Sequence, residues 1–188
     1  APAPPPARQA FRNSSLQSWG ITTMESEEDG RYHAFVDTLS NNCGLGSWIT
    51  NSQIIHATSD APTGPFAMHE VVLPVFHSNP QLVRHTDGPY LLFTIGQTNT
   101  TASYQSDCRT SPPTPSSCAP MSIFPPRCYT GNRIELHHAS SLDGPWQLLT
   151  LADGSSDILP GGTNPAPYVT SNGSVVLAFT GQGVPGVG

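Results

Sequence analysis

Lysine is absent from this sequence, and charge of either sign is scarce. The seven basic residues are all arginine, 13 residues are acidic, and the 188-residue chain carries a net charge of −6. Only 11% of the residues are charged, far below the share in an average soluble domain. No basic face is available for nucleic acid or anionic lipid, and no apolar run approaches the length that spans a bilayer. We therefore expect neither nucleic acid nor membrane insertion among its partners.

Motifs that bind metals or nucleotides are also missing. The sequence has no His-x-Glu, no His-Glu-x-x-His and no aspartate-rich loop, so we expect no metal and no other cofactor. The cysteines form no Cys-x-x-Cys pair, which favours disulfides over zinc. Disulfides persist in oxidising compartments such as the extracellular space, and three glycosylation sequons also indicate secretion. We therefore predict a secreted glycoprotein. The cysteines are Cys43, Cys108, Cys118 and Cys128, and the sequon asparagines are Asn13, Asn99 and Asn172.

Helical periodicity is lacking throughout. Short runs rich in Val, Ile, Phe and Tyr alternate with Gly, Pro, Asn and Asp, which is typical of an all-β chain. Two stretches align without a gap: "NPQLVRHTDGPYLLFTIGQ" at 79–97 and "NPAPYVTSNGSVVLAFTGQ" at 164–182. A second pair, 54–66 and 134–146, shares a strand followed by a Gly-Pro-aromatic corner. Serial repetition of a small sheet predicts a β-propeller; a β-sandwich with similar turns is the alternative.

The repeats divide the chain into units. Residues 1–15 form a Pro-rich arm, 16–73 a first blade, 74–155 a second blade with a Cys-rich loop at 99–132, and 156–188 the first half of a third. Propellers close with four to eight blades, so about two and a half blades leave an open edge. We expect this chain to be a fragment of a longer protein, or to be completed by self-assembly or by a second chain.

At this level of detail the sequence resembles a known superfamily. The frames "DGRYHAFVDTLSNNCGLGSW", "HSNPQLV", "DGPYLLFTIG", "HHASSLDGPW" and "NPAPYV" are similar to the five-bladed propellers of the family-43 glycoside hydrolases, arabinanase- and sialidase-like proteins, in an uncharacterised branch and over their N-terminal half. The resemblance implies hydrolysis of a glycosidic bond with inversion, by carboxyl groups on the first strands of three successive blades.

The positions that should carry those carboxyl groups differ in this sequence. The second and third blades have Asn79 and Asn164, each before a proline, and the first blade has Trp19-Gly20. An amide cannot exchange a proton at neutral pH, so both asparagines are predicted to bind sugar hydroxyls.

Other residues are candidates for the catalytic acid or base. Asp37 follows the second strand beside the expected site, and Asp157 precedes the third inner strand. The alternatives are a loop acceptor for Asp37 and a turn residue for Asp157. Glu135 is interpreted as a solvated surface residue.

Aromatic and histidine side chains complete the predicted sugar site. Trp19 and Trp48 could stack on a sugar ring, with core packing as the alternative for each. His77 lies two residues before Asn79 and could donate to a hydroxyl.

The Cys-rich loop occupies the same slot in the second repeat as the loop that contains Cys43 in the first. Cys43 should therefore pair with one of the other three cysteines, and the remaining two with each other; the sequence does not fix which.

Three functions stay open: a secreted glycoside hydrolase with unusual carboxylates, a carbohydrate-binding propeller that has lost catalysis, and a structural unit of an extracellular surface or fibre.

Overall fold

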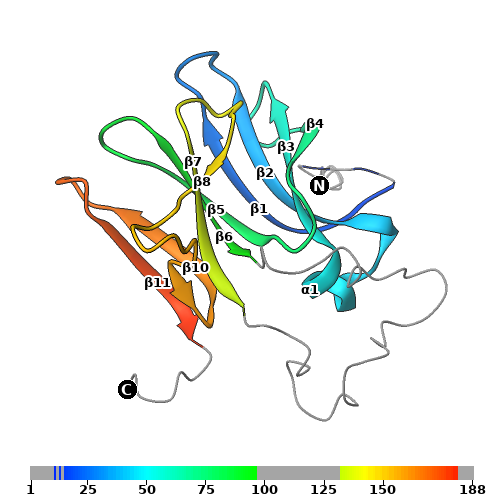
Figure 1. Ribbon diagram of the computed structural model, residues 1–188. Coiled ribbons are helices and arrows are strands. Elements are labelled where there is room, and N and C mark those ends of the chain that lie inside the picture. Colours follow the sequence, from blue (N-terminus) through cyan, green and yellow to red (C-terminus); the bar gives the residue numbers. More distant parts are fainter. Residues whose placement is uncertain (1–10, 12, 14, 97–131, 182–188) are drawn as a thin grey trace, which may run out of the picture.

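Three antiparallel sheets, standing side by side in chain order, make up the computed structural model (Figure 1). It describes residues 11, 13, 15–96 and 132–181. The first sheet is a four-stranded meander, ordered β1-β2-β3-β4. Its strands are β1 (Gln17–Glu25), β2 (Tyr32–Leu39), β3 (Ser52–Ser59) and β4 (Ala67–Leu73). Three short helical turns connect β2 to β3: η1 (Ser40–Asn42), η2 (Leu45–Ser47) and α1 (Trp48–Asn51).

The second sheet repeats the same meander, and a hairpin follows it. The second sheet contains β5 (Ser78–Arg84), β6 (Tyr90–Gly96), β7 (Arg133–Ala139) and β8 (Gln147–Leu148). A short strand, β9 (Leu159–Pro160), pairs with β7. The hairpin consists of β10 (Gly162–Val169) and β11 (Val175–Gly181). Two meanders and the first half of a third are the blades that the repeats predict, and the all-β propeller class is confirmed.

Apolar side chains fill the space between neighbouring sheets. Alternate residues of β6 point to opposite faces. One set packs toward the first sheet, in a cluster of Phe35, Ile54, Leu73, Leu82, Tyr90, Leu92 and Leu142. The other set packs toward the hairpin, in a cluster of Leu91, Phe93, Ile134 and Leu136, against which Leu177 of β11 lies. The second sheet therefore buries both faces against its neighbours, as a propeller blade does.

The second Gly-Pro-aromatic corner joins the first two sheets. Trp146 packs its ring edge against Phe35 of the first sheet, with 5.1 Å between the ring centroids. The peptide bonds Gly64-Pro65 and Gly144-Pro145 are both cis. Trp146 thus packs between the first two sheets.

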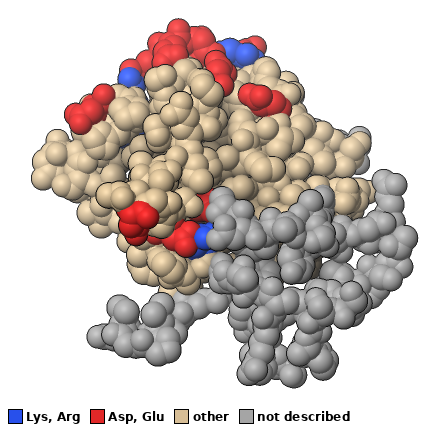
Figure 2. All heavy atoms as spheres, in the orientation of Figure 1, with Lys and Arg blue, Asp and Glu red and all other residues tan. Residues whose placement is uncertain are grey.

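The Asp/Asn-Gly pairs form the turns between the first and second strands of each unit. Gly30, Gly88 and Gly173 have φ values of 70°, 110° and 83°, in the region that favours glycine. Acidic side chains gather along the upper edge of the molecule, where the β1–β2 turn lies (Figure 2). The β1–β2 turn therefore lies at an acidic edge. None of the helices in the described part of the chain is long and apolar enough to cross a membrane.

Candidate functional site

The first strands of the three units lie next to one another, with β5 between β1 and β10. Each strand contains a bulge near its start: at Trp19 in β1, at Asn79-Pro80 in β5 and at Asn164-Pro165 in β10. Bulges re-aim side chains and are frequent beside functional sites. We call Trp19, Asp37, Trp48, Asn79 and Asn164 the inner-strand site.

Asn79 and Asn164 share an uncommon backbone conformation. Their φ values are 51° and 50°, in the left-handed region where asparagine is enriched. The Nδ2 of Asn79 donates a hydrogen bond of 2.5 Å to the Oδ1 of Asn164. Asn164 in turn donates through Nδ2 to the Oγ1 of Thr180, at 3.4 Å. The two amides thus form a link between the second sheet and the hairpin that two carboxylates could not make at neutral pH.

Asp37 lies in β2, directly behind the bulges. Its side chain is fully buried, and its Oδ2 accepts a hydrogen bond of 2.9 Å from the backbone N–H of Asn79. Its Oδ1 has no hydrogen-bond partner among the described residues. Burial raises the pKa of Asp37 to about 7, although the Asn79 N–H and the nearby Ser52 and Trp19 side chains act in the opposite direction. Asp37 can therefore exchange a proton near neutral pH.

The indole of Trp19 lies next to Asp37, and the indole of Trp48 lies against Trp19. Trp19 is 38% exposed and donates through Nε1 to the Oγ of Ser52, at 3.4 Å. Trp48 in α1 is half-buried and meets the Trp19 ring edge-on, with 6.2 Å between the centroids. The two predicted tryptophans are thus brought together near the start of β1, with part of their surface accessible to a ligand.

His77 is placed behind the bulge of β5 and contacts a buried acid. Its Nδ1 donates to the carbonyl oxygen of Pro74 at 2.9 Å, and its Nε2 lies 3.2 Å from Oε2 of Glu135. His137 lies against His77, with 5.7 Å between the ring centroids. We call His77, Glu135 and His137 the His-Glu cluster.

Glu135 is the residue that sequence reasoning placed wrongly. The residue is fully buried in β7, not at the solvated surface. An added Cβ on Gly96 would lie 2.1 Å from its carboxyl carbon, so the glycine of β6 leaves room for the acid. Glu135 alternates with apolar residues, and such a pattern does not reveal that its face of β7 is covered by His77. Gly96, diagonally across from it on β6, was the available signal.

The electrostatics of the His-Glu cluster favour a neutral imidazole beside a carboxylate. Burial raises the pKa of Glu135, but His77, His137 and Arg133 outweigh it and hold the pKa below its ordinary value. Burial, assisted by the charge of His77, lowers the pKa of His137 to about 4.

Asp157, the second predicted catalytic carboxylate, is engaged in an ion pair. Its Oδ1 accepts a hydrogen bond of 2.6 Å from Nη1 of Arg133. Asp157 is partly exposed, whereas Arg133 is nearly buried. Arg133 also places Nε 3.3 Å from Oε1 of Glu135. The described contacts of Asp157 therefore favour a role in holding Arg133.

The predicted covalent modifications are placed only in part. Cys43 is fully buried and disulfide-bonded. Asn172 is exposed in the β10–β11 turn, and Asn13 is partly exposed. The remaining positions, Asn99, Cys108, Cys118 and Cys128, lie outside the described residues. The disulfide pairing stays a prediction.

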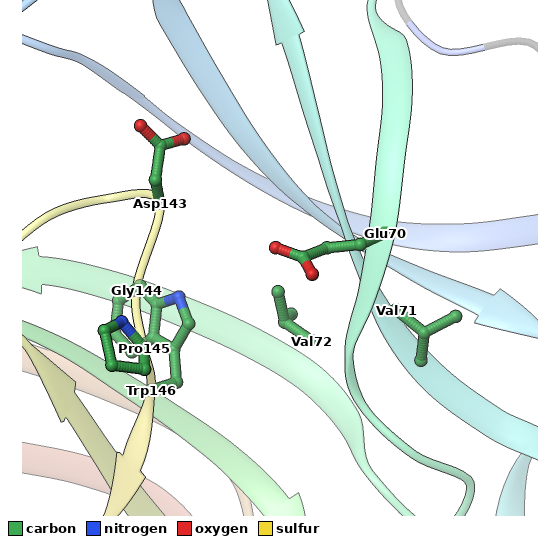
Figure 3. Close-up of a pocket in the computed structure, with 7 residues that line it drawn as sticks. All are labelled: Glu70, Val71, Val72, Asp143, Gly144, Pro145 and Trp146. Atoms are coloured by element: carbon green, nitrogen blue, oxygen red, sulfur yellow. The ribbon is translucent and has the colours of Figure 1, made fainter.

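A pocket of about 450 Å³ opens between β4 and the second Gly-Pro-aromatic corner. Figure 3 shows Glu70 and Val72 of β4 pointing toward the segment from Asp143 to Trp146, whereas Val71 points to the other side of the strand. The Oδ1 of Asp143 lies 3.9 Å from Nδ1 of His33, at the turn end of β2. Because His33 and Asp37 are separated by about 13 Å along the strand, this pocket is distinct from the inner-strand site.

No protein-family model and no curated protein matches the sequence. Solved structures do match. A GH43 β-xylosidase/α-arabinofuranosidase from a compost microbial metagenome has a TM-score of 0.52 and 11% identity, over 88% of this chain and 45% of that chain. A family 117 glycoside hydrolase of Zobellia galactanivorans has a TM-score of 0.53 and 14% identity, over 87% of this chain and 48% of that chain. A protein of unknown function from Dyadobacter fermentans has a TM-score of 0.54 and 13% identity, over 88% of this chain and 47% of that chain.

The fold is that of a GH43-like propeller. The chain spans less than half the length of each of these three structures. Identities this low establish the fold and leave the chemistry to be argued from the residues present.

Proposed function

We propose that this chain belongs to a propeller that acts on carbohydrate, and that the inner-strand site binds the sugar. The observation that carries the proposal is that the indole of Trp19 and two amides lie at the bulges of three adjacent strands, with the partly exposed indole of Trp48 against Trp19. A sugar ring has an apolar face that stacks on aromatic side chains, and hydroxyl groups that pair with amides. The site offers both kinds of contact.

Hydrolysis is the second candidate, and Asp37 favours it. A general acid or base works best with a pKa near the operating pH, and the pKa of Asp37 is about 7. Inversion needs a second carboxyl group about 6.5–9.5 Å away, with room for a water. Asp157 is held by Arg133, so we expect any partner carboxyl group to come from elsewhere in a longer protein.

An extracellular location remains part of the proposal. It rests on the buried, disulfide-bonded Cys43 and on the exposed sequon asparagine Asn172, both of which suit an oxidising compartment.

Binding can be tested by titrating the purified chain with a panel of neutral oligosaccharides. Xylotriose is included because a GH43_1 enzyme of Xanthomonas citri was solved with it. Trp19→Ala and Trp48→Ala should each weaken binding about tenfold, as expected for the loss of one aromatic contact. Tyr168→Ala is the matched control, since this aromatic side chain is 66% exposed on β10, outside the site.

Two results would count against the proposal. If no oligosaccharide binds, the inner-strand site is not a sugar site, and a structural role leads. If Tyr168→Ala weakens binding as much as Trp19→Ala, the sugar binds elsewhere. Sugar release by the wild type, lost in Asp37→Asn with binding retained, would add hydrolysis to binding.

A further inference from the structure

We propose that His77, Glu135 and His137 bind a divalent transition-metal ion, for which Zn²⁺ is the best match. One donor atom from each side chain lies within 4.8 Å of the others, and all three residues are buried. This inference does not depend on the proposed sugar site, and it differs from the sequence-based expectation that the chain binds no metal.

The backbone brings these donors together from two segments. Glu135 and His137 are alternate residues of β7, so their side chains leave the same face of the strand. His77 precedes β5 and reaches that face from the neighbouring strand end. About sixty positions separate His77 from the other two, and no short motif links them, which explains why the sequence does not predict the site.

The hydrogen bond of His77 fixes which nitrogen is free. The carbonyl oxygen of Pro74 can only accept, so Nδ1 of His77 carries the hydrogen. In a neutral imidazole the Nε2 lone pair then points toward Oε2 of Glu135, 3.2 Å away. Histidine ligands of metals commonly have this arrangement, in which a backbone carbonyl orients the ring and sets its tautomer.

Four polar atoms of the cluster lack a hydrogen bond among the described residues, although Glu135 lies within ion-pair distance of His77 and Arg133. The Nε2 of His77, both carboxylate oxygens of Glu135 and Nδ1 of His137 have no hydrogen bond within the part of the chain that the structure describes. Buried polar groups without partners are rare in folded proteins. A proton shared between His77 and Glu135 would satisfy one contact and leave His137 unpaired. A cation would satisfy donors from all three side chains.

Arg133 does not replace such a cation. Its Nη1 is bound to Asp157, and its Nε approaches Glu135 to 3.3 Å without forming a hydrogen bond. The Arg133 charge is therefore shared between two carboxylates, and its hydrogen bond goes to Asp157.

The donor set selects the class of ion. Two imidazoles and one carboxylate suit Zn²⁺ and its first-row neighbours better than Ca²⁺ or Mg²⁺, which prefer oxygen ligands. Two ligands of a tetrahedral Zn²⁺, bonded at 2.0–2.1 Å, are about 3.3 Å apart. The separation of 3.2 Å between His77 and Glu135 matches this value. Three protein ligands leave a fourth position for water.

The test measures metal binding by the chain itself. The protein is stripped with a chelator and titrated with Zn²⁺, and with Co²⁺ as a spectroscopic probe of tetrahedral sites. We expect about one Zn²⁺ per chain, and roughly 100-fold weaker binding in His137→Gln and Glu135→Gln. His138→Gln is the matched control, because this adjacent residue of β7 points to the opposite face. It should bind as the wild type does.

The second histidine cluster provides another control. His33, His56 and Asp143 also lie close together, but His33 and His56 already contact each other at 2.9 Å. His33→Gln should therefore retain the metal. The proposal is overturned if the wild type binds no Zn²⁺ and gains no thermal stability from it. It is also overturned if His33→Gln removes binding, or if a folded His137→Gln, checked by circular dichroism, binds normally.

Discussion

Asn79 donates a hydrogen bond to Asn164, which lies 85 residues further along the chain at the same position of the next repeat. Both residues have left-handed φ values, and both precede a proline in a bulge. Asparagine in place of an expected aspartate thus has a structural consequence. Two ionised carboxylates at these positions would repel each other, whereas one amide can donate to the other.

The direction of this hydrogen bond predicts an asymmetry between two identical substitutions. Asn79→Asp removes the donor and should lower the free energy of unfolding at neutral pH by about 1 kcal/mol. Asn164→Asp keeps the acceptor and loses only the 3.4 Å contact to Thr180, so its effect should be smaller. Urea unfolding of both variants measures the difference. Equal losses would show that the amide of Asn79 is not the donor.

Asp37 should make the stability of the protein depend on pH. Its pKa is about 7 in the folded chain against 3.8 ordinarily, so between these values the folded state binds more protons than the unfolded state. Stability therefore falls as pH rises from about 4 to about 7, because the charged form is buried. Asp37→Asn keeps an acceptor for Asn79 and carries no charge. As the pH rises from 4.5 to 7.5, the free energy of unfolding of Asp37→Asn should increase by a few kcal/mol relative to that of the wild type.

Asp29 serves as the control for that experiment. A hydrogen bond from the backbone of Arg31 is the main cause that lowers its pKa, to about 2. Between pH 4.5 and pH 7.5, Asp29 is ionised in both the folded and the unfolded state. Asp29→Asn should therefore change the free energy of unfolding by the same amount at pH 4.5 and at pH 7.5. A pH-independent difference for Asp37→Asn as well would mean that Asp37 does not hold a proton in the fold.

Features that recur in each repeat could be predicted from the sequence. A feature that occurs in one repeat only could not. The turns at Gly30, Gly88 and Gly173 and the packing of Trp146 follow from local chemistry that recurs in each unit. Glu135 has no such signal: the register pairs it with Thr94, at the position where the first sheet has Ile55. Burial there depends on His77, which arrives from another strand, and this kind of contact is visible only in three dimensions.

Gly96 should tolerate no side chain. Its missing Cβ leaves the space that the Glu135 carboxyl group occupies, so Gly96→Ala forces a buried acid to move. We expect a loss of about 1–3 kcal/mol in the free energy of unfolding, the range for overpacked interiors. Gly44→Ala is the control, because a Cβ there meets nothing within 4 Å. Denaturant unfolding of the two variants compares them, and similar midpoints would contradict the packing of Glu135 against Gly96.

Two ion pairs in this chain differ in burial, and they should differ in strength. Arg133 is nearly buried and held by Asp157, whereas Arg31 and Asp60 are 39% and 91% exposed. Asp157→Asn removes the carboxylate that is hydrogen-bonded to a nearly buried guanidinium, which keeps only the 3.3 Å contact with Glu135, and should cost about 1–3 kcal/mol. Asp60→Asn should change stability by less than about 1 kcal/mol. Thermal unfolding of both variants, with sugar release assayed in parallel, also decides the role of Asp157. Lost sugar release at unchanged stability would instead identify it as a catalytic residue.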